Sequence, residues 1–344
     1  MTHTIRHFLI LSFTSLLLFF VSEAKAQHVE LLQQDKPTSI RGLSVVDDSV
    51  AWISGSKGYI AITTNGGKTW AWQQVKGYEQ ADFRDIEAFS TKEAIIMSSG
   101  TPALILKTTD GGQSWQLKYK NTDTAYFLDA MDFADTKHGY ILGDPINNKF
   151  LLLETKDGGN TWNSFNNPPA ALPNEAAFAA SGTCLRVDGS TISIVTGGSQ
   201  SRVLVFPGNN ATNYWFSGST GLKHGKPSQG AFSLAQNGST QIFVGGDYAN
   251  DKITDSIASI IVYCCYANTI QYPKTEPSGY QSCVEYIKDK TFLSTGTPGT
   301  NITTNSGQTW TKIDTTSYNV CRKAKHGTLV LLAGNNGKIG ILKP

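Results

Sequence analysis

Short apolar runs recur along the chain, and glycine-rich or polar turns separate them. Between these turns each unit offers four β-rich runs, which in one unit span residues 82–89, 93–99, 103–109 and 114–119. Strands of this kind, bounded by turn residues, predict antiparallel sheets. Four strands in every repeat of about 45 residues are typical of a propeller blade. A glycine ends one apolar run in each unit, at Gly55, Gly100, Gly143, Gly197, Gly245, Gly296 and Gly334.

A turn motif marks the same repeat independently, as TTNGGKTW at 63–70, TTDGGQSW at 108–115, TKDGGNTW at 155–162 and TTNSGQTW at 303–310. Asp or Asn bonds the backbone of its own turn, and glycine supplies the positive φ of a tight hairpin. The tryptophan opens the next strand and buries its ring between sheets. Segments 208–215 and 265–272 replace the motif in two units, ending at Trp215 and Tyr272. We expect a structural role for Asn65, Trp70, Asp110, Trp115, Asp157, Trp162, Asn305 and Trp310.

The two ends of the chain complete one ring. The last unit has only three β-rich runs, ending at 338–343, and the N-terminal run Val29–Gln33 precedes the first unit. Pairing these two runs removes the exposed edges of an open array. The sequence therefore predicts an all-β fold. It is a single seven-bladed β-propeller over residues 27–344, with four antiparallel strands per blade and a ring closed by the N-terminal strand.

Residues 1–26 are expected to be a signal peptide. Arg6 precedes a 14-residue apolar run over 8–21, and Ala24-Lys25-Ala26 forms a small-x-small cleavage site. No second apolar run reaches about 18 residues, the length of a membrane span. The chain after residue 26 retains 27 basic and 26 acidic residues, so it is nearly neutral. We expect an exported monomer, periplasmic or secreted, without a membrane span.

The turn motif resembles the Asp-box, or bacterial neuraminidase repeat. The chain as a whole resembles the seven-bladed photosystem II stability/assembly-factor-like family and its non-photosynthetic bacterial relatives. Four further segments carry this likeness: 82–85 (DFRD), 143–146 (GDPI), 178–183 (FAASGT) and 245–248 (GGDY). The resemblance implies the fold more than an activity, because propellers host many functions. Nothing in the sequence indicates photosynthesis, so the relatives' partner is not transferred.

Loop parity predicts a polar site at the centre of one face. The interblade loops and the loops between second and third strands open on the face opposite the turn motifs. Convergent arginines and carboxylates there suit an anionic or sugar ligand. An ion-pair network that merely satisfies a polar channel is an equally good interpretation. The candidate residues are Arg41, Asp82, Arg84, Asp85, Asp129, Asp144, Glu175, Arg202, Asp247 and Tyr280.

Two function classes follow from these residues. The first is a non-catalytic binding or assembly platform for a protein partner or a small polar or anionic molecule or glycan. The second is a sialidase-like glycoside hydrolase, in which Arg41, Arg84 and Arg202 hold a carboxylate beside Tyr280 or Tyr248, with Glu175 and Asp85 as partners. The Arg-Ile-Pro signature of such enzymes is missing, since Gly42-Leu43 follows Arg41. We prefer the platform.

Other chemistry finds little support in the sequence. Four scattered histidines follow residue 26, and no paired Cys-x-x-Cys or His-x-Glu-x-x-His occurs, so no metal is expected. No cofactor or nucleotide is expected either, because the Gly-Gly pairs do not open a strand-to-helix phosphate loop. Dispersed lysines matched by acids argue against nucleic acid.

Five cysteines in an exported chain are an odd set, so at least one thiol stays unpaired within the chain. Cys264 and Cys265 are neighbours, and a bond between them would strain the backbone. Cys283 and Cys321 each follow a tyrosine by three residues at the start of consecutive blades. Equivalent positions on adjacent inner strands approach near the axis, which makes a disulfide between them conceivable. The alternative is that both are small buried packing residues.

Overall fold

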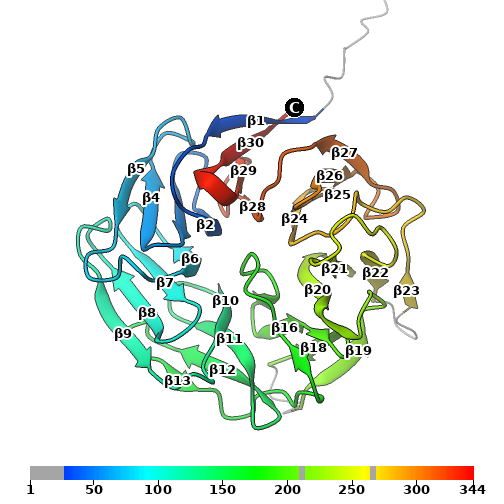
Figure 1. Cartoon of the computed structure of the whole chain (residues 1–344), viewed down its shortest axis with the longest axis horizontal. Coiled ribbons are helices and arrows are strands. Elements are labelled where there is room, and N and C mark those ends of the chain that lie inside the picture. Colours follow the sequence, from blue (N-terminus) through cyan, green and yellow to red (C-terminus); the bar gives the residue numbers. More distant parts are fainter. Residues whose placement is uncertain (1–26, 209–213, 264–268) are drawn as a thin grey trace, which may run out of the picture.

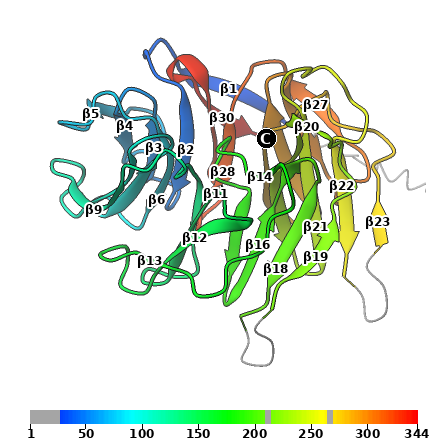
Figure 2. The same ribbon diagram turned by 60° about the horizontal axis from the view of Figure 1, so that its bottom comes forward.

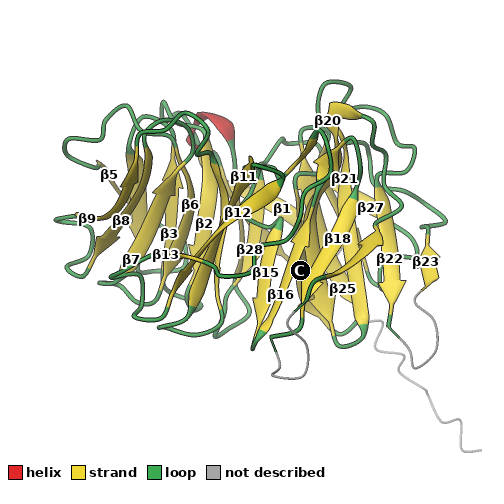
Figure 3. Ribbon diagram, turned by 90° about the horizontal axis from the view of Figure 1, so that it is seen from below, coloured by secondary structure: helices red, strands yellow, loops and turns green. Residues whose placement is uncertain are grey.

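The apolar runs fold as the strands of seven four-stranded antiparallel sheets arranged in a ring (Figure 1). The structure is a computed structural model that describes residues 27–208, 214–263 and 269–344. The expected signal peptide and Cys264 and Cys265 lie outside these residues. Seen from the side, the strands run between the two faces of the ring (Figure 3). The predicted fold class is confirmed.

The first three blades take their strands in chain order from the inside outward. Blade 1 contains β2 (Ile40–Val45), β3 (Ala51–Gly55), β4 (Tyr59–Thr63) and β5 (Ala71–Gln74). Blade 2 contains β6 (Phe83–Ala88), β7 (Ala94–Ser98), β8 (Ala103–Thr108) and β9 (Gln116–Asn121). Blade 3 contains β10 (Leu128–Phe133), β11 (Gly139–Ile146), β12 (Lys149–Thr155) and β13 (Asn163–Ser164).

Blades 4 to 6 follow the same order, with one addition. Blade 4 contains β15 (Leu185–Asp188), β16 (Thr191–Val195), β18 (Arg202–Phe206) and β19 (Phe216–Ser219). Blade 5 contains β20 (Lys226–Asn237), β21 (Thr240–Asp247), β22 (Ala258–Val262) and β23 (Thr269–Gln271). The short strands β14 (Glu175–Ala176) and β17 (Gly197–Gly198) extend this fifth sheet beyond β20. Blade 6 contains β24 (Cys283–Lys288), β25 (Thr291–Gly296), β26 (Gly299–Thr303) and β27 (Thr311–Asp314).

Blade 7 joins the two ends of the chain. Its strands are β28 (Val320–Lys323), β29 (Val330–Ala333), β30 (Ile339–Lys343) and, outermost, β1 (His28–Gln33). The register pairs His28 with Lys343 and Glu30 with Ile341. A single 3-10 turn (Asn335–Gly337) is the one helical element among the described residues. The predicted closure by the N-terminal strand is therefore confirmed.

Burial explains why the inner strands carry continuous apolar runs instead of alternating ones. Every residue of β3, β7 and β25 is buried, because each sheet has a neighbouring blade on both faces. The fourth strands lie at the rim, and no residue of β5, β9 or β19 is fully buried. The hydrophobic core is accordingly a series of layers between blades.

The four copies of the turn motif, here called the box turns (63–70, 108–115, 155–162 and 303–310), share one hydrogen-bond pattern. In the third copy, Thr155 Oγ1 donates to Asp157 Oδ1 at 2.9 Å and accepts from Gly159 N at 2.8 Å. Asp157 Oδ1 also accepts from Thr161 N at 2.9 Å. The ring of Trp162 packs against Phe133 at 6.0 Å between centroids. The threonine and the Asp or Asn of each copy are thus bonded within their own turn.

The segments 208–215 and 265–272 that replace the motif lie partly outside the described residues.

Side chains on each inner strand hold the backbone of the next blade. In blade 2, for example, Asp85 Oδ2 accepts from Met131 N of blade 3 at 2.8 Å. Five of the seven contacts between neighbouring blades have this arrangement. Hydrogen bonds near the axis therefore hold the ring together in addition to packing. The acceptor and donor atoms are Ser44 Oγ and Ala88 N, Asp85 Oδ2 and Met131 N, Asp132 Oδ2 and Val187 N, Ser233 Oγ and Val284 N, and Cys283 Sγ and Cys321 N.

Candidate functional site

β-bulges place several predicted site residues on the face opposite the box turns, here called the opposite face. The pairing of the first and second strands shifts register at Arg41 in blade 1, Arg84 in blade 2 and Asp129 in blade 3. Phe232 occupies the same position in blade 5. A bulge leaves one residue outside the ladder and redirects its side chain. Four blades therefore present a side chain at an equivalent point near the axis.

A loop over residues 178–182, here called the plug loop, closes the axis at this face. It leads from β14 toward β15, and the green ribbon before β16 reaches toward the middle of the ring in Figure 1. Arg41 Nη1 donates to Ala180 O at 3.2 Å, and Arg84 Nη1 donates to Ala179 O at 3.5 Å. Phe178 stacks on Phe232 with centroids 3.8 Å apart. Two of the predicted ligand arginines thus bind the chain's own backbone.

Apart from Asp85, which is buried and holds Met131 N of the next blade, the predicted residues divide into two groups. One group lies around the plug loop. Arg84, 29% exposed at its side chain, pairs with Asp82 at 2.7 Å, and Asp144 Oδ1 accepts from Ala177 N at 3.3 Å. Burial, reinforced by Asp144, raises the pKa of Asp129 well above its usual range, against the opposing charge of Arg84. The structure therefore brings Arg41, Asp82, Arg84, Asp129 and Asp144 to one place.

The second group has local partners instead. Arg202 makes a bidentate pair with Glu175, with Nε to Oε1 at 2.8 Å and Nη2 to Oε2 at 2.6 Å. Asp247 accepts from Gln229 and from the backbone N–H of Ala249 within its own turn. Tyr280 is buried in an edge-to-face contact with Phe232 at 4.8 Å. Glu175, Arg202 and Asp247 thus have partners of their own, whereas Tyr280 packs with Ala180 of the plug loop and is close enough to Arg41 for their charges to interact.

The sialidase-like alternative gains no support from this geometry. Such a site needs three arginines free to hold one carboxylate, and the guanidinium of Arg202 is already bonded to Glu175. Burial raises the pKa of Tyr280 above its usual range, which disfavours the phenolate that a nucleophile needs. Asp85, cast as an acid/base partner, is 1% exposed, and its oxygens accept from Ile86 N and Met131 N.

The hollow part of the ring lies on the other side of the plug loop. A cavity of about 760 Å³ is lined by residues of all seven blades, including Val46, Phe89 and Asp135 at the ends of inner strands. The box turns dock on the loops that follow these strands, as Gly66 N donates to Ser49 O and Gly158 N to Lys137 O. The cavity therefore opens on the box-turn face, which points downward in Figure 2, away from the 3-10 turn drawn in red at the top.

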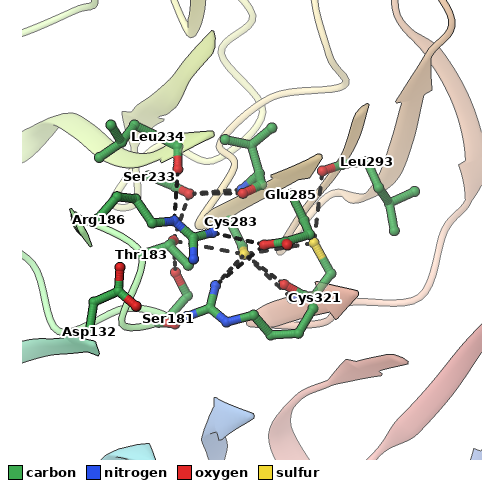
Figure 4. Close-up of polar contacts among 12 residues, drawn as sticks. Asp132, Ser181, Thr183, Arg186, Ser233, Leu234, Cys283, Glu285, Leu293 and Cys321 are labelled. Carbon is green, nitrogen blue, oxygen red and sulfur yellow. Dashed lines mark hydrogen bonds and ion pairs between the residues drawn. The ribbon is translucent and has the colours of Figure 1, made fainter. Parts of the chain in front are cut away.

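Charged side chains line the wall of this cavity, and Figure 4 shows Asp132, Arg186 and Glu285 among them. Arg186 pairs with Glu285 at 2.8 Å, and Arg322 lies 3.7 Å from the same carboxylate. Arg322 Nη2 also donates to Ser181 O of the plug loop at 3.2 Å, so this ring supports the plug from below. Lys325 pairs with Glu87 nearer the mouth. We call Glu87, Asp132, Arg186, Glu285, Arg322 and Lys325 the axial charge ring.

Sequence reasoning did not select these residues, although it placed them on inner strands. Loop parity selects the starts of strands, whereas Arg186, Glu285 and Arg322 lie inside them. One signal was available: Arg186 and Glu285 each follow a cysteine by two residues, at Cys184 and Cys283. Residues two apart share a face of a strand. A charged residue at the same position of two inner strands predicts that both side chains line the same wall near the axis.

Buried carboxyls near the axis make stability depend on pH. Burial raises the pKa of Asp85 from 3.8 to about 7, against Arg322 and two backbone N–H groups, and raises that of Asp132 to about 6, against Arg186. A carboxyl with a raised folded pKa binds its proton more tightly in the folded state. Its contribution is fully present below about pH 4 and is lost as the pH rises toward 7.

We therefore expect Asp85→Asn, which cannot ionise, to gain stability relative to the wild type between pH 4.5 and 7.5. The difference in free energy of unfolding should grow by up to about 1.4 kcal/mol per pH unit. Urea denaturation of both proteins across this window measures it. Asp110 titrates below the window, since hydrogen bonds, chiefly from Ser114, lower its pKa to about 2. Parallel pH profiles for the two proteins would contradict the assignment.

The described residues contain no group of three or more histidine, cysteine, aspartate or glutamate side chains placed to hold a metal ion. Within the same ranges, no helix has the length and apolarity needed to cross a membrane.

The fold defines a seven-bladed β-propeller with a plugged axis, and comparisons with known proteins find photosystem II assembly factors similar to parts of the chain. A family model described as photosynthesis system II assembly factor YCF48 matches residues 21–124. The photosystem II assembly lipoprotein Ycf48 of Synechococcus sp. (strain CC9902) is 26% identical over 162 residues, which cover 47% of this chain and 46% of that protein. The chloroplastic photosystem II stability/assembly factor HCF136 of Oryza sativa subsp. japonica is 36% identical over 73 residues, 20% of this chain and 17% of that protein. The matches thus span about half or less of these curated relatives.

Solved structures show the fold over most of the chain. A structure of YCF48 bound to a D1 peptide superposes with a TM-score of 0.64 at 15% identity, covering 92% of this chain and 97% of that one. YCF48 from Cyanidioschyzon merolae gives 0.60 at 13% identity, with 92% and 99% covered. The Pan2 WD40 domain of Neurospora crassa gives 0.62 at 14% identity, with 92% and 95% covered. Since an unrelated propeller scores as well, these likenesses establish architecture alone.

Proposed function

We propose that this protein is an exported, non-catalytic propeller that binds a polar segment of a partner protein in the cavity on its box-turn face. The main support for this proposal is the 760 Å³ cavity lined by all seven blades, whose volume lies within the usual range of ligand sites. The plug loop closes the axis behind it, so a ligand enters and leaves from one side. The solved YCF48 with a bound D1 peptide lends support, because that propeller takes a peptide.

The charges in the cavity favour a polar ligand over an apolar one. Both signs line the wall, and several groups near the mouth, among them Asp188, Gln236 and Lys325, are exposed. Charged side chains or a terminus of the bound segment would form ion pairs with these groups. We expect such binding to have modest affinity and to weaken markedly with added salt. A small anionic molecule or a glycan would meet the same groups and is the second occupant to test.

A phage library of random decapeptides tests the proposal, with affinities of selected synthetic peptides measured by calorimetry at low and high salt. The cavity variant is Asp188→Asn with Lys323→Gln. The matched control is Arg84→Gln with Tyr248→Ser on the opposite face, where Tyr248 is 54% exposed. We expect the cavity variant to weaken binding by about tenfold or more, equivalent to about 1.4 kcal/mol, and the control to leave it unchanged. If only the control variant lost peptide binding, the site would lie on the opposite face. If the library yielded no binding peptide, the proposed platform function would be refuted.

A further inference from the structure

Two thiols face each other on adjacent inner strands beside the axial charge ring. Cys283 on β24 and Cys321 on β28 are fully buried free thiols, with their sulfur atoms 3.7 Å apart (Figure 4). No disulfide joins these two described cysteines, so the bridge anticipated from the sequence stays a prediction. Cys184 is the third described cysteine and is also free and buried. The close pair calls for a chemical explanation beyond packing.

The surroundings distinguish the two sulfur atoms. Cys283 Sγ accepts from Cys321 N at 3.4 Å, and Arg322 Nη1 lies 4.0 Å from it. Burial and Glu285 raise the pKa of Cys283, but bonds from the Cys321 thiol and backbone, together with the charge of Arg322, outweigh them and lower it. Burial and the bond to Cys283 raise the pKa of Cys321. Cys283 is therefore the more acidic thiol of the pair, and in its protonated form its Sγ donates to Cys321 O at 3.3 Å.

We propose that Cys283 is a hydroperoxide-reactive cysteine and that Cys321 is its resolving thiol. The Cys283 thiolate attacks one oxygen of hydrogen peroxide, the O–O bond breaks, and the departing hydroxide takes a proton to leave as water. Cys321 then attacks the resulting sulfenic sulfur, the S–O bond breaks, and the Cys321 proton leaves with that oxygen as a second water. Two thiols and one peroxide give one disulfide and two waters. The sulfurs are oxidised and the peroxide oxygens are reduced.

The oxidant has a short route to the pair. Arg322 and Glu285 line the cavity and also flank Cys283, so a molecule as small as hydrogen peroxide needs only a side-chain fluctuation to reach the sulfur. The reaction is independent of the proposed peptide binding, because it needs only the thiols and their neighbours.

Oxidation would also change the electrostatic contacts of the plug loop. Thr183 Oγ1 lies 3.8 Å from Cys283 Sγ, and Arg322 joins the same sulfur to Ser181 O. Turning the thiolate into a neutral disulfide removes the negative charge that Arg322 faces. The new bond also links β24 to β28 covalently. Oxidation of the pair would therefore change the contacts of both the plug loop and the cavity wall.

Differential alkylation with non-reducing peptide mapping tests the proposal on the reduced chain after residue 26, treated with stoichiometric hydrogen peroxide. We expect a Cys283–Cys321 bridge in the wild type. In Cys321→Ser, sulfenic acid should accumulate at Cys283, where dimedone traps it. Cys283→Ser should form neither product at Cys321, and it should fold, because Ser233 holds the next blade in the same way through its hydroxyl.

Cys184→Ser is the matched control and should form the bridge at the wild-type rate, since burial raises the pKa of Cys184 and leaves it unreactive. Arg322→Gln should slow oxidation by about tenfold and shift its pH profile upward, an effect that packing alone would not produce. The proposal is overturned if Cys283 and Cys321 both remain alkylated after peroxide that oxidises glutathione in the same tube. It is also overturned if Cys321→Ser yields no trapped adduct at Cys283.

Discussion

A chain that starts at Thr38 should be much less stable than one that starts at Gln27, with a free energy of unfolding lower by more than about 3 kcal/mol. The truncation removes β1, which pairs with β30 from His28 to Gln33. Each lost ladder bond costs about 1 kcal/mol, and Val29, 8% exposed, withdraws from the core around Tyr318. It also leaves β30 as an open edge, which promotes aggregation. Thermal and urea unfolding of the two chains measure the loss.

Point substitutions within β1 separate closure from a general effect of shortening. Val29→Ser should destabilise the full chain, whereas Leu31→Ser, at a position 45% exposed, should change stability little. Coincident unfolding curves for the truncated and full chains would show that the ring does not depend on its terminal strand.

The repeat made the fold predictable, because each blade restates the same strand and turn pattern. Glycine-ended runs and box turns placed the strands, and the spare run 29–33 identified the closing strand. Continuous apolar runs also had a single physical explanation, since inner strands such as β7 are covered on both faces. Consistency between local and global signals is what makes a sequence specify one fold.

The site was less predictable because its main element is not repeated. Among the described residues the plug loop has no counterpart in the other blades, so comparing units could not show that Arg41 and Arg84 bond its carbonyl groups. Loop parity indicated which residues begin inner strands and predicted that they would converge, and the structure places Arg41, Asp82, Arg84, Asp129 and Asp144 around the plug loop. It could not reveal bulges, which redirect Arg41 and Asp129 by one residue. Nor could it predict the ion pair of Arg186, because the partner Glu285 lies 99 residues away in the sequence.

Substituting Gly182 with alanine should dislodge the plug loop and destabilise the protein by about 3 kcal/mol or more. Gly182 has a φ of +69°, a conformation that costs an L-residue about 1–2 kcal/mol. A Cβ there would lie 2.1 Å from Asp85 Oδ2. That carboxyl group cannot easily yield, since Ile86 N and Met131 N hold its two oxygens at 2.9 and 2.8 Å. Forcing extra volume into a packed site adds about 1–3 kcal/mol.

Gly189→Ala is the matched control for this substitution. Gly189 also has a positive φ, +56°, but a Cβ there meets nothing within 4 Å, so the variant carries the backbone cost without the clash. Urea denaturation followed by tryptophan fluorescence should give a larger loss for Gly182→Ala than for Gly189→Ala. Adding Asp85→Ala should recover part of the loss of Gly182→Ala, because it removes the clashing atoms, and a double-mutant cycle measures this coupling. Equal losses for the two glycine variants, or strict additivity with Asp85→Ala, would mean that the plug loop does not rest on Asp85.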